Sequence, residues 1–309
     1  MERSTANDYG MDKYRPLPRV VCYDDFDRGT CGWVDLTPNF TKENFTARPS
    51  IIDKTQWGPV MLSTATFGYV GTHGSMDGIY SLKLATRPTG GAYEEPPRLG
   101  SMSHTIKRMS VQGPKGLKQI EMWYAYTPEQ DRIGLSEQDI RAFGLFCDVQ
   151  DEEHRYFIGV RYLNSVNGQL HQRWQYMQAA DVTDEQWAYG TTGDWCKRGI
   201  DPMWYGRRST DGATDGFQYV PGGEQQLCYN ESDDKINWLY VRLLFDTASR
   251  EYVELQSGDQ VFDLRGIRPT LVPPYARIRG LFNPGIWIET DARRRAFLFV
   301  DSVVVSSED

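Results

Sequence analysis

The stretch from Lys118 to Tyr176 constrains the fold of this chain more than any other feature. It contains four runs rich in aromatic and β-branched residues, KQIEMWYAY, FGLFCDV, HRYFIGVRYLN and QLHQRWQYM, which short polar connections separate. Such runs, interrupted by Pro, acidic residues or Asn-Gly, are typical of consecutive antiparallel strands. Along several of them one face is apolar and the other carries Glu, Arg, His and Trp. The pattern predicts a sheet with one side for the core and one side for a ligand.

Similar runs occur on both sides of this stretch, among them MLSTATFGYV, IYSLKLAT, INWLYVRLLF and RAFLFVDSVVV. Helical patterns are rare, and only 136–139 and 183–186 resemble helix N-terminal capping sequences. Many short strands joined by long connections predict an all-β fold. We expect a two-sheet antiparallel β-sandwich of the jelly-roll type, with long loops and one or two short helices.

The sequence predicts one domain preceded by a tail. Residues 1–19 are polar and contain Pro16 and Pro18, which favour an extended N-terminal tail. Residues 20–309 form the predicted β-sandwich domain, because sandwiches of this length occur as single units. Within it, 178–230 places Trp and Tyr among Gly, Asp and Arg with little alternation. We expect a loop-rich insertion there, folded over one end or face of the sheet.

Charge and hydropathy exclude several classes of partner. The net charge of −8 and the isoelectric point near 5.2 argue against nucleic-acid binding, which needs clustered Lys and Arg. No apolar run reaches transmembrane length, and the N-terminus lacks the apolar core of a signal peptide. We therefore expect no membrane partner and a cytoplasmic location for the chain as written, or secretion if a signal has been removed. The oligomeric state stays open.

The five cysteines show no metal-binding spacing, so a structural zinc site is not expected. Cys147 alternates with apolar neighbours and is interpreted as a core residue. Cys22 with Cys31, or Cys196 with Cys228, would pair only in an oxidising compartment.

Motifs for common cofactors and hydrolases are missing from the sequence. It contains no Gly-rich phosphate loop after a strand, no GxSxG and no HExxH. Nucleotide cofactors, serine hydrolysis and zinc proteolysis therefore have no support, and neither do flavin or haem.

The non-core side of the predicted sheet carries the candidate ligand-binding residues. If the strands are neighbours, these side chains converge on one concave surface, where aromatic rings stack on sugar C–H groups and charged groups bind hydroxyls or carboxylates. The predicted ligand-binding residues are Trp123, Arg155, Arg173, Trp238, Tyr240, Arg242 and Tyr252. The alternative is an ordinary solvent-exposed face with cross-strand ion pairs. The indole rings favour a ligand-binding face.

Catalysis on this surface would need an acid–base group. His171 is the candidate, because the pKa of histidine lies near neutrality, although a histidine on a strand is more often structural. In a lyase reaction Arg161 would stabilise the enolate, with Arg242 as the alternative. For hydrolysis, Glu121 and Glu254 are the carboxylate pair. The candidate proton donors are Tyr162, Tyr240 and Tyr252.

The two ends of the predicted sandwich carry a family resemblance. The opening YDDFDRGTCGW and the closing FLFVDSVVV resemble the first and last strands of concanavalin A-like and related jelly-roll sandwiches. Those folds include carbohydrate-binding modules, laminin-G-like domains, glycoside hydrolases and polysaccharide lyases. The resemblance implies a structural calcium ion, for which the matching positions are Asp24, Asp25, Asp27 and Asp301. The alternative for the first three is a solvated turn.

Motifs that would define one activity match only in part. Gln169-Leu170-His171 fits the QxH strand of alginate-type lyases, but YxKxG does not occur. The ExDxE strand of laminarinase-type glycosidases is reduced to Glu121. We expect a carbohydrate or glycoside ligand, bound by a lyase or glycosidase. The alternatives are a non-catalytic, lectin-like protein and a structural or oligomerising sandwich.

Overall fold

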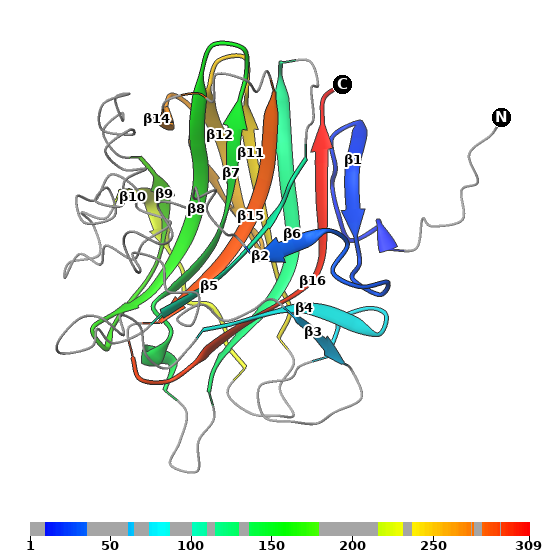
Figure 1. The fold of residues 1–309 in the computed structure, drawn as a ribbon. Coiled ribbons are helices and arrows are strands. Elements are labelled where there is room, and N and C mark those ends of the chain that lie inside the picture. Colours follow the sequence, from blue (N-terminus) through cyan, green and yellow to red (C-terminus); the bar gives the residue numbers. More distant parts are fainter. Residues whose placement is uncertain are drawn as a thin grey trace, which may run out of the picture.

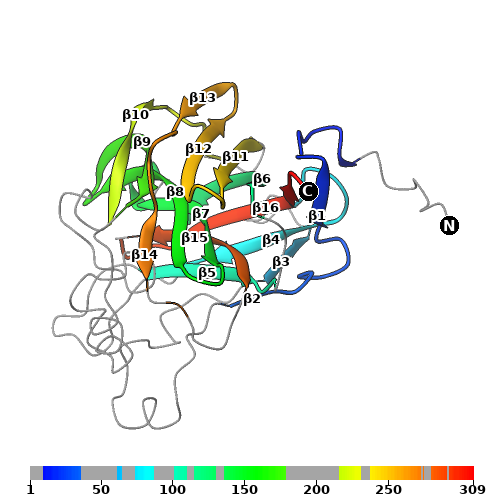
Figure 2. The same cartoon turned by 90° about the horizontal axis from the view of Figure 1, so that it is seen from above.

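A computed structural model describes residues 10–35, 61–64, 74–86, 101–109, 115–129, 136–178, 216–230, 237–272, 274, 280–290 and 292–309. Two antiparallel sheets pack against each other (Figure 1), and the view from above separates them into two layers (Figure 2). The predicted all-β, two-sheet antiparallel sandwich is confirmed.

Sheet A is built around the C-terminal strand. Its order is β13 (Gln260–Asp263), β12 (Glu251–Ser257), β11 (Leu239–Asp246), β6 (Leu117–Pro128), β16 (Ala296–Ser307), β4 (Tyr80–Ala85) and β3 (Met61–Thr64), and β1 (Arg19–Asp24) also pairs with β16. Strands far apart in the chain are therefore neighbours, since β6 lies between β11 and β16.

Sheet B contains most of the stretch from Lys118 to Tyr176. Its order is β10 (Phe217–Glu224), β9 (Gln169–Met177), β8 (Arg155–Val166), β7 (Ala142–Gln150), β15 (Leu281–Thr290), β5 (Ser101–Lys107) and β2 (Trp33–Asp35), and β14 (Thr270–Val272) also pairs with β8. Three of the four predicted runs are consecutive hairpin strands here, whereas the first run is β6 of the other sheet.

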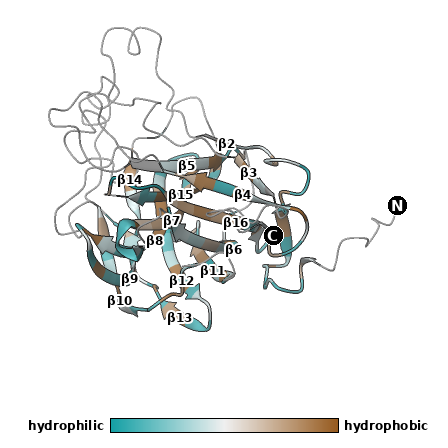
Figure 3. Ribbon diagram, turned by 90° about the horizontal axis from the view of Figure 1, so that it is seen from below, coloured by the Kyte–Doolittle hydropathy of each residue, from teal (hydrophilic) through white to brown (hydrophobic). Residues whose placement is uncertain are grey.

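The core lies between the sheets and follows the period-2 alternation of the strands. On β6, Ile120, Met122 and Tyr124 belong to the main hydrophobic cluster, so Glu121 and Trp123 face outward from sheet A. Figure 3 shows hydrophobic and hydrophilic residues within the same strands. We call the side of each sheet that faces away from the other sheet its outer face.

The predicted helices and the predicted insertion have different outcomes. A single 3-10 helix, Glu137–Asp139, occurs at the first predicted helix, while 183–186 lies outside the described residues. Of the predicted insertion at 178–230, residues 179–215 also lie outside them, and β10 adds an edge strand to sheet B. No helix in the described part of the chain has the length and apolar character needed to cross a membrane.

Residues 10–18, here called the N-terminal strap, lie across the outer face of sheet A. The Arg15 backbone N–H donates to Glu121 Oε1 at 2.7 Å, and Gln119 Nε2 donates to the Arg15 carbonyl at 2.8 Å. Further along, the Leu17 N–H donates to Ser306 Oγ at 3.0 Å. Side chains of β6 and β16 thus bind the backbone of the strap.

Candidate functional site

The predicted polar surface is divided between two faces on opposite sides of the molecule. Glu121, Arg242 and Glu254 lie on sheet A, whereas Arg161 and His171 lie on sheet B. The hydrophobic core separates the outer faces of these sheets. The prediction of one concave surface that holds all of these residues is therefore wrong, because β6 pairs with β11 and β16 and not with β8.

The outer face of sheet B carries an unbroken row of residues across six strands. Each residue is the cross-strand partner of the next, so their side chains lie on the same face. From β10 to β5 the row is Tyr219, Gln175, Arg161, Gly144, Trp287 and His104. Four types of hydrogen-bonding side chain and a tryptophan are thus aligned across the sheet.

Glycines allow aromatic rings to lie close to this face. A Cβ on Gly144 would stand 2.6 Å from Cη2 of Trp287, so the indole ring covers this glycine. A Cβ on Gly285 would stand 2.1 Å from the ring of Phe146. Only glycine leaves room for these rings, and the contact explains why glycine occurs inside central strands.

A buried cluster of charges lies beside the indole. Arg161 Nε donates to Gln175 Oε1 at 2.7 Å, and Arg161 NH1 lies 3.5 Å from Glu289 Oε1. The second Glu289 oxygen lies 3.5 Å from Arg141 Nε. Arg161 and Arg141 are each 1% exposed and Glu289 is 5% exposed. Burying three charged groups costs free energy, and such clusters are common at functional sites.

Aromatic contacts complete this cluster. The Arg161 guanidinium carbon lies 3.9 Å from the Phe217 ring centroid, and that ring lies 6.2 Å from Trp287. His104 lies 6.4 Å from Trp287 on the other side. Burial lowers the pKa of His104 to about 3, so this imidazole is neutral at physiological pH.

The accessible part of the face is the margin formed by β9 and β10, where His171, Arg173 and Tyr219 are half-buried. The Arg173 guanidinium carbon lies 4.0 Å from the Tyr219 ring centroid, and Arg173 NH2 lies 2.6 Å from Glu224 Oε1. Burial, followed by the positive charges of Arg141 and Arg173, lowers the pKa of His171. The margin therefore combines a neutral imidazole, a guanidinium and a phenol.

Several residues of this face were not predicted from the sequence. They are Arg141, Gln175, Glu289, Trp287 and His104. The available signal was a charged or polar residue next to a buried apolar run, as in RAFGLF and GIWIET. That signal identifies each residue separately. It does not show that Arg141 and Glu289 contact each other, because their contact depends on the pairing of β15 with β7.

The predicted glycosidase pair does not form. Glu121 is fully buried and its Oε1 accepts hydrogen bonds from the Tyr240 hydroxyl at 2.6 Å and from the N-terminal strap. Glu254 instead makes an ion pair with Arg242 on the neighbouring strand. Trp123 packs against Tyr240, with ring centroids 5.4 Å apart and ring planes tilted by 49°. Glu121 binds the N-terminal strap and Tyr240, while Glu254 binds Arg242. The two carboxylates therefore do not flank an open site.

Tyr252 and Arg155 also differ from their predicted ligand-binding role. Tyr252 is fully buried in the core, where its hydroxyl contacts the backbone of β8 and β9. Arg155 makes a two-pronged ion pair with Asp148, with Nε–Oδ1 at 2.9 Å and NH2–Oδ2 at 2.8 Å. It begins β8, six residues from Arg161, which places them about 20 Å apart along the strand.

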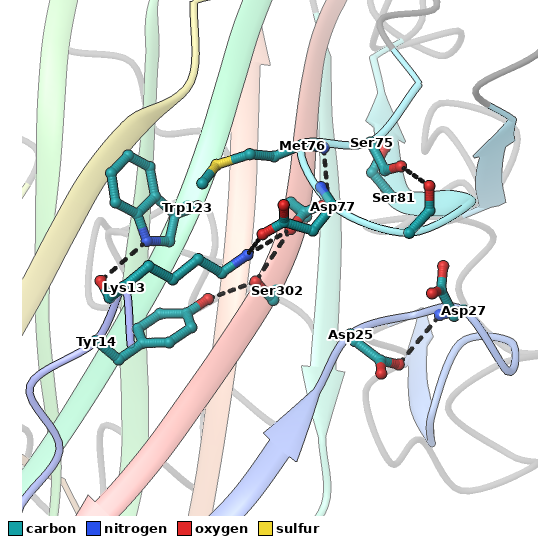
Figure 4. Close-up of polar contacts among 12 residues, drawn as sticks. Lys13, Tyr14, Asp25, Asp27, Ser75, Met76, Asp77, Ser81, Trp123 and Ser302 are labelled. Carbon is teal, nitrogen blue, oxygen red and sulfur yellow. Dashed lines mark hydrogen bonds and ion pairs between the residues drawn. The ribbon is translucent and has the colours of Figure 1, made fainter. Parts of the chain in front are cut away.

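The predicted calcium ligands do not converge on one point. Asp301 lies 3.0 Å from the ammonium of Lys13, which also reaches Asp77 at 2.6 Å (Figure 4). Asp24 lies 2.6 Å from the ammonium of Lys107.

The other two carboxylates bind backbone N–H groups, Asp27 at the start of β4 and Asp25 within its own turn. Asp27 Oδ1 accepts from the N–H groups of Ile79 and Tyr80, and Asp25 Oδ1 accepts from the Asp27 N–H at 3.2 Å. No group of three His, Cys, Asp or Glu suited to a metal occurs among the described residues. Lysine ammonium groups thus supply the positive charge at the two buried carboxylates, and the four residues do not fit a shared calcium ion.

The comparisons with known proteins come at the level of family and fold. The whole chain, residues 1–309, matches the family model described as Domain of unknown function (DUF6772). The chain belongs to this family. Among curated proteins, no sequence matches this chain.

Solved structures with a similar arrangement include lectin-like domains and alginate lyases. The carbohydrate recognition domain of Emp47p is 8% identical, with a TM-score of 0.37 over 90% of this chain and 96% of that chain. Alginate lyase vAL-1 from Chlorella virus is 9% identical, with a TM-score of 0.38 over 80% and 92%. The legume lectin-like domain from Entamoeba histolytica is 8% identical, with a TM-score of 0.35 over 80% and 89%. Likenesses this distant do not bear on activity.

Proposed function

We propose that this protein is a carbohydrate-active enzyme that binds a uronate-bearing saccharide on the outer face of sheet B and cleaves it by β-elimination. The observation that carries the proposal is the partly exposed margin formed by β9 and β10, where the Arg173 guanidinium carbon lies 4.0 Å from the Tyr219 ring centroid and the charge of Arg173 acts on His171. These three side chains supply the types of group that the reaction requires.

Arg173 is the proposed carboxylate-binding group. Its partner Glu224 is on an exposed edge strand, and exposed ion pairs contribute little stability. A substrate carboxylate can therefore replace Glu224 and accept the same guanidinium hydrogen bonds. Neutralising the carboxylate lowers the free energy of the enolate-like transition state.

His171 is the proposed base and Tyr219 the proposed acid. The neutral imidazole takes the proton from the carbon next to the carboxylate, the C–O bond at the neighbouring carbon breaks, and the leaving oxygen takes a proton from the phenol. Burial, followed by the positive charges of Arg141 and Arg173, lowers the pKa of His171 and so favours its basic form. Arg161 is 1% exposed, so we assign it a positioning role in the buried row, in place of the direct catalytic role predicted from the sequence.

The test follows two signals on a panel of neutral and uronic polysaccharides: new reducing ends and the absorbance of unsaturated uronates. We expect both signals on a uronic substrate. His171→Ala should lower the rate by about a hundredfold or more. His154→Ala is the matched control, because this half-exposed histidine lies in the β7–β8 connection and contacts Arg250.

Other outcomes would contradict the proposal in different ways. Reducing ends without unsaturated products would mean hydrolysis, for which this face has no suitable carboxylate pair among the described residues. Full activity of His171→Ala would place the site elsewhere. Saccharide binding by calorimetry without either signal would favour the lectin-like alternative.

A further inference from the structure

A β-bulge in β9 lies directly beside His171. In the ladder between β8 and β9, two residues of β9, His171 and Gln172, together oppose one residue of β8, Asn164. The backbone of Gln172 has a φ of 50°, in the left-handed region that glycine and asparagine adopt most readily. Bulges and strained residues of this kind recur beside active sites, where they change the direction of a neighbouring side chain.

The turn between β8 and β9 explains why an extra residue has to be accommodated. Asn167 and Gly168 have φ values of 49° and 78°, which are typical of a two-residue type I′ hairpin loop. This turn fixes the register at the end of the hairpin. A regular ladder continued from Arg173 would instead place His171 opposite Ser165. The imidazole would then lie up to one residue step, about 3.4 Å, from its present place along the strand.

Hydrogen bonds from two other segments hold Gln172 in the bulge. Its Nε2 atom donates to Glu137 Oε1 of the 3-10 helix at 3.1 Å. Its carbonyl oxygen accepts from the Gln225 N–H, just beyond β10, at 3.0 Å. Gln225 is fixed in turn, because its Oε1 accepts from the Trp174 Nε1–H at 2.8 Å. Both the side chain and the backbone of Gln172 are therefore bound.

The residue opposite the bulge is bound to the same helix. Asn164 is fully buried, and its Nδ2 donates to the carbonyl oxygens of Glu137 at 2.8 Å and Ile140 at 2.9 Å. Its backbone N–H donates to the Arg141 carbonyl at 2.8 Å. The 3-10 helix thus contacts both strands at the bulge. A strained backbone persists only where such surrounding contacts hold it.

We infer that Gln172 is a positioning residue, whose left-handed backbone, held by Glu137 and Gln225, sets the direction in which the His171 imidazole leaves β9. The inference rests on the proposed role of His171 as the base. Burial and two neighbouring guanidinium groups lower the pKa of the imidazole in this place. A displacement of about 1 Å at a catalytic group lowers a rate by about a hundredfold, so the bulge is as necessary as the base itself.

Two substitutions at this position separate the backbone conformation from the side chain. Gln172→Gly and Gln172→Val both remove the contact with Glu137, but only glycine adopts a positive φ without strain. On the uronic polysaccharide that the wild type cleaves fastest, Gln172→Gly should keep kcat within about threefold, whereas Gln172→Val should lower it about a hundredfold. KM should change little in either variant, because Arg173 keeps its pairing.

Arg250→Val is the matched control for backbone strain. Arg250 has the same left-handed conformation, with a φ of 57°, in the connection between β11 and β12. Its replacement should lower Tm and leave kcat unchanged. Circular dichroism shows whether each variant is folded.

A titration of the histidine resonances by NMR gives a readout without substrate, and the loss of one resonance in His171→Ala identifies His171. Gln172→Gly should keep the wild-type pKa of His171, and Gln172→Val should raise it, because the ring leaves the positive charges. Glu137→Ala should raise this pKa and lower kcat relative to Glu137→Gln. These two variants carry the same charge, but only the glutamine keeps an acceptor for Gln172.

Equal kcat values or equal His171 pKa values in Gln172→Gly and Gln172→Val would overturn the inference. If Gln172→Val does not fold, equal values in the two Glu137 variants would overturn it instead. If the wild type cleaves no saccharide, the proposed function fails, while the titrations still decide whether Gln172 positions His171.

Discussion

Tyr252→Phe is expected to destabilise the protein because of a backbone gap in sheet B. The ladder between β8 and β9 runs from Val166 to Val160 and stops there. Immediately beyond it, the Tyr252 hydroxyl accepts the Gly159 N–H at 2.9 Å and lies 2.8 Å from the Met177 carbonyl oxygen. A side chain of sheet A thus satisfies two backbone groups where two strands of sheet B separate.

The size of the loss in stability follows from the backbone groups that phenylalanine leaves without a hydrogen-bond partner. The ring keeps its volume and its packing, so the substitution opens almost no cavity. Gly159 loses its hydroxyl acceptor and Met177 loses a donor, both in the interior, at about 1 kcal/mol each. We expect a loss of about 2 kcal/mol in the free energy of unfolding and a fall of about 4 °C in Tm.

Urea unfolding and calorimetry measure this difference, with Tyr176→Phe as the matched control. Tyr176 packs 5.9 Å from Tyr252, but its hydroxyl makes no hydrogen bond to another described residue. The control should therefore change stability by less than about 0.5 kcal/mol. Equal effects of the two substitutions would refute the bridging role of Tyr252, and so would loss of saccharide binding in a Tyr252→Phe protein that stays folded.

Three further predictions concern the site and its support. If His171 is the base, activity should be lost as the pH falls through its lowered pKa. Arg173→Gln removes one positive charge and should move this loss of activity to higher pH. An unchanged pH profile would contradict the assignment. Lys107→Met should lower the free energy of unfolding, measured in urea, by about 3 kcal/mol, because Asp24 stays buried without its cation. A decrease below about 1 kcal/mol would contradict this. Gly285→Ala should cost about 1–3 kcal/mol, because the new Cβ overlaps an aromatic ring, and an unchanged Tm would show that the ring moves freely.

Much of the fold could be predicted because strand alternation is a local property. Residues such as Ile120 and Met122 are apolar at every second position, and both lie in the core. The 3-10 helix at Glu137–Asp139 was predicted from its capping pattern, but Ser136 makes no side-chain capping hydrogen bond. The edge strand β10 was not predicted, because its sequence, FQYVPGGE, contains Pro and two Gly that indicate a loop.

The candidate site was predictable only in part. His171 and Arg173 were recognised by their residue types on a strand, and both belong to the accessible margin. Their combination with Glu121 was wrong, because outward alternation says that a side chain leaves the core but not from which sheet. Tyr252 shows the same limit, since the bulge between Leu244 and Phe245 shifts the pairing of its strand.

By itself, the sequence determined that the chain folds as a β-sandwich and which side chains of a strand such as β6 face the core, because both follow from the two-residue period of an extended backbone. Only the tertiary structure decided which strands are neighbours. The pairing of β6 with β11 joins residues more than 100 positions apart, and that of β7 with β15 joins a similar distance. Such long-range pairings assembled Arg141, Arg161 and Glu289 into one cluster and packed Trp238 against the cluster of Ala85, Ala125, Phe297 and Phe299 on the opposite face.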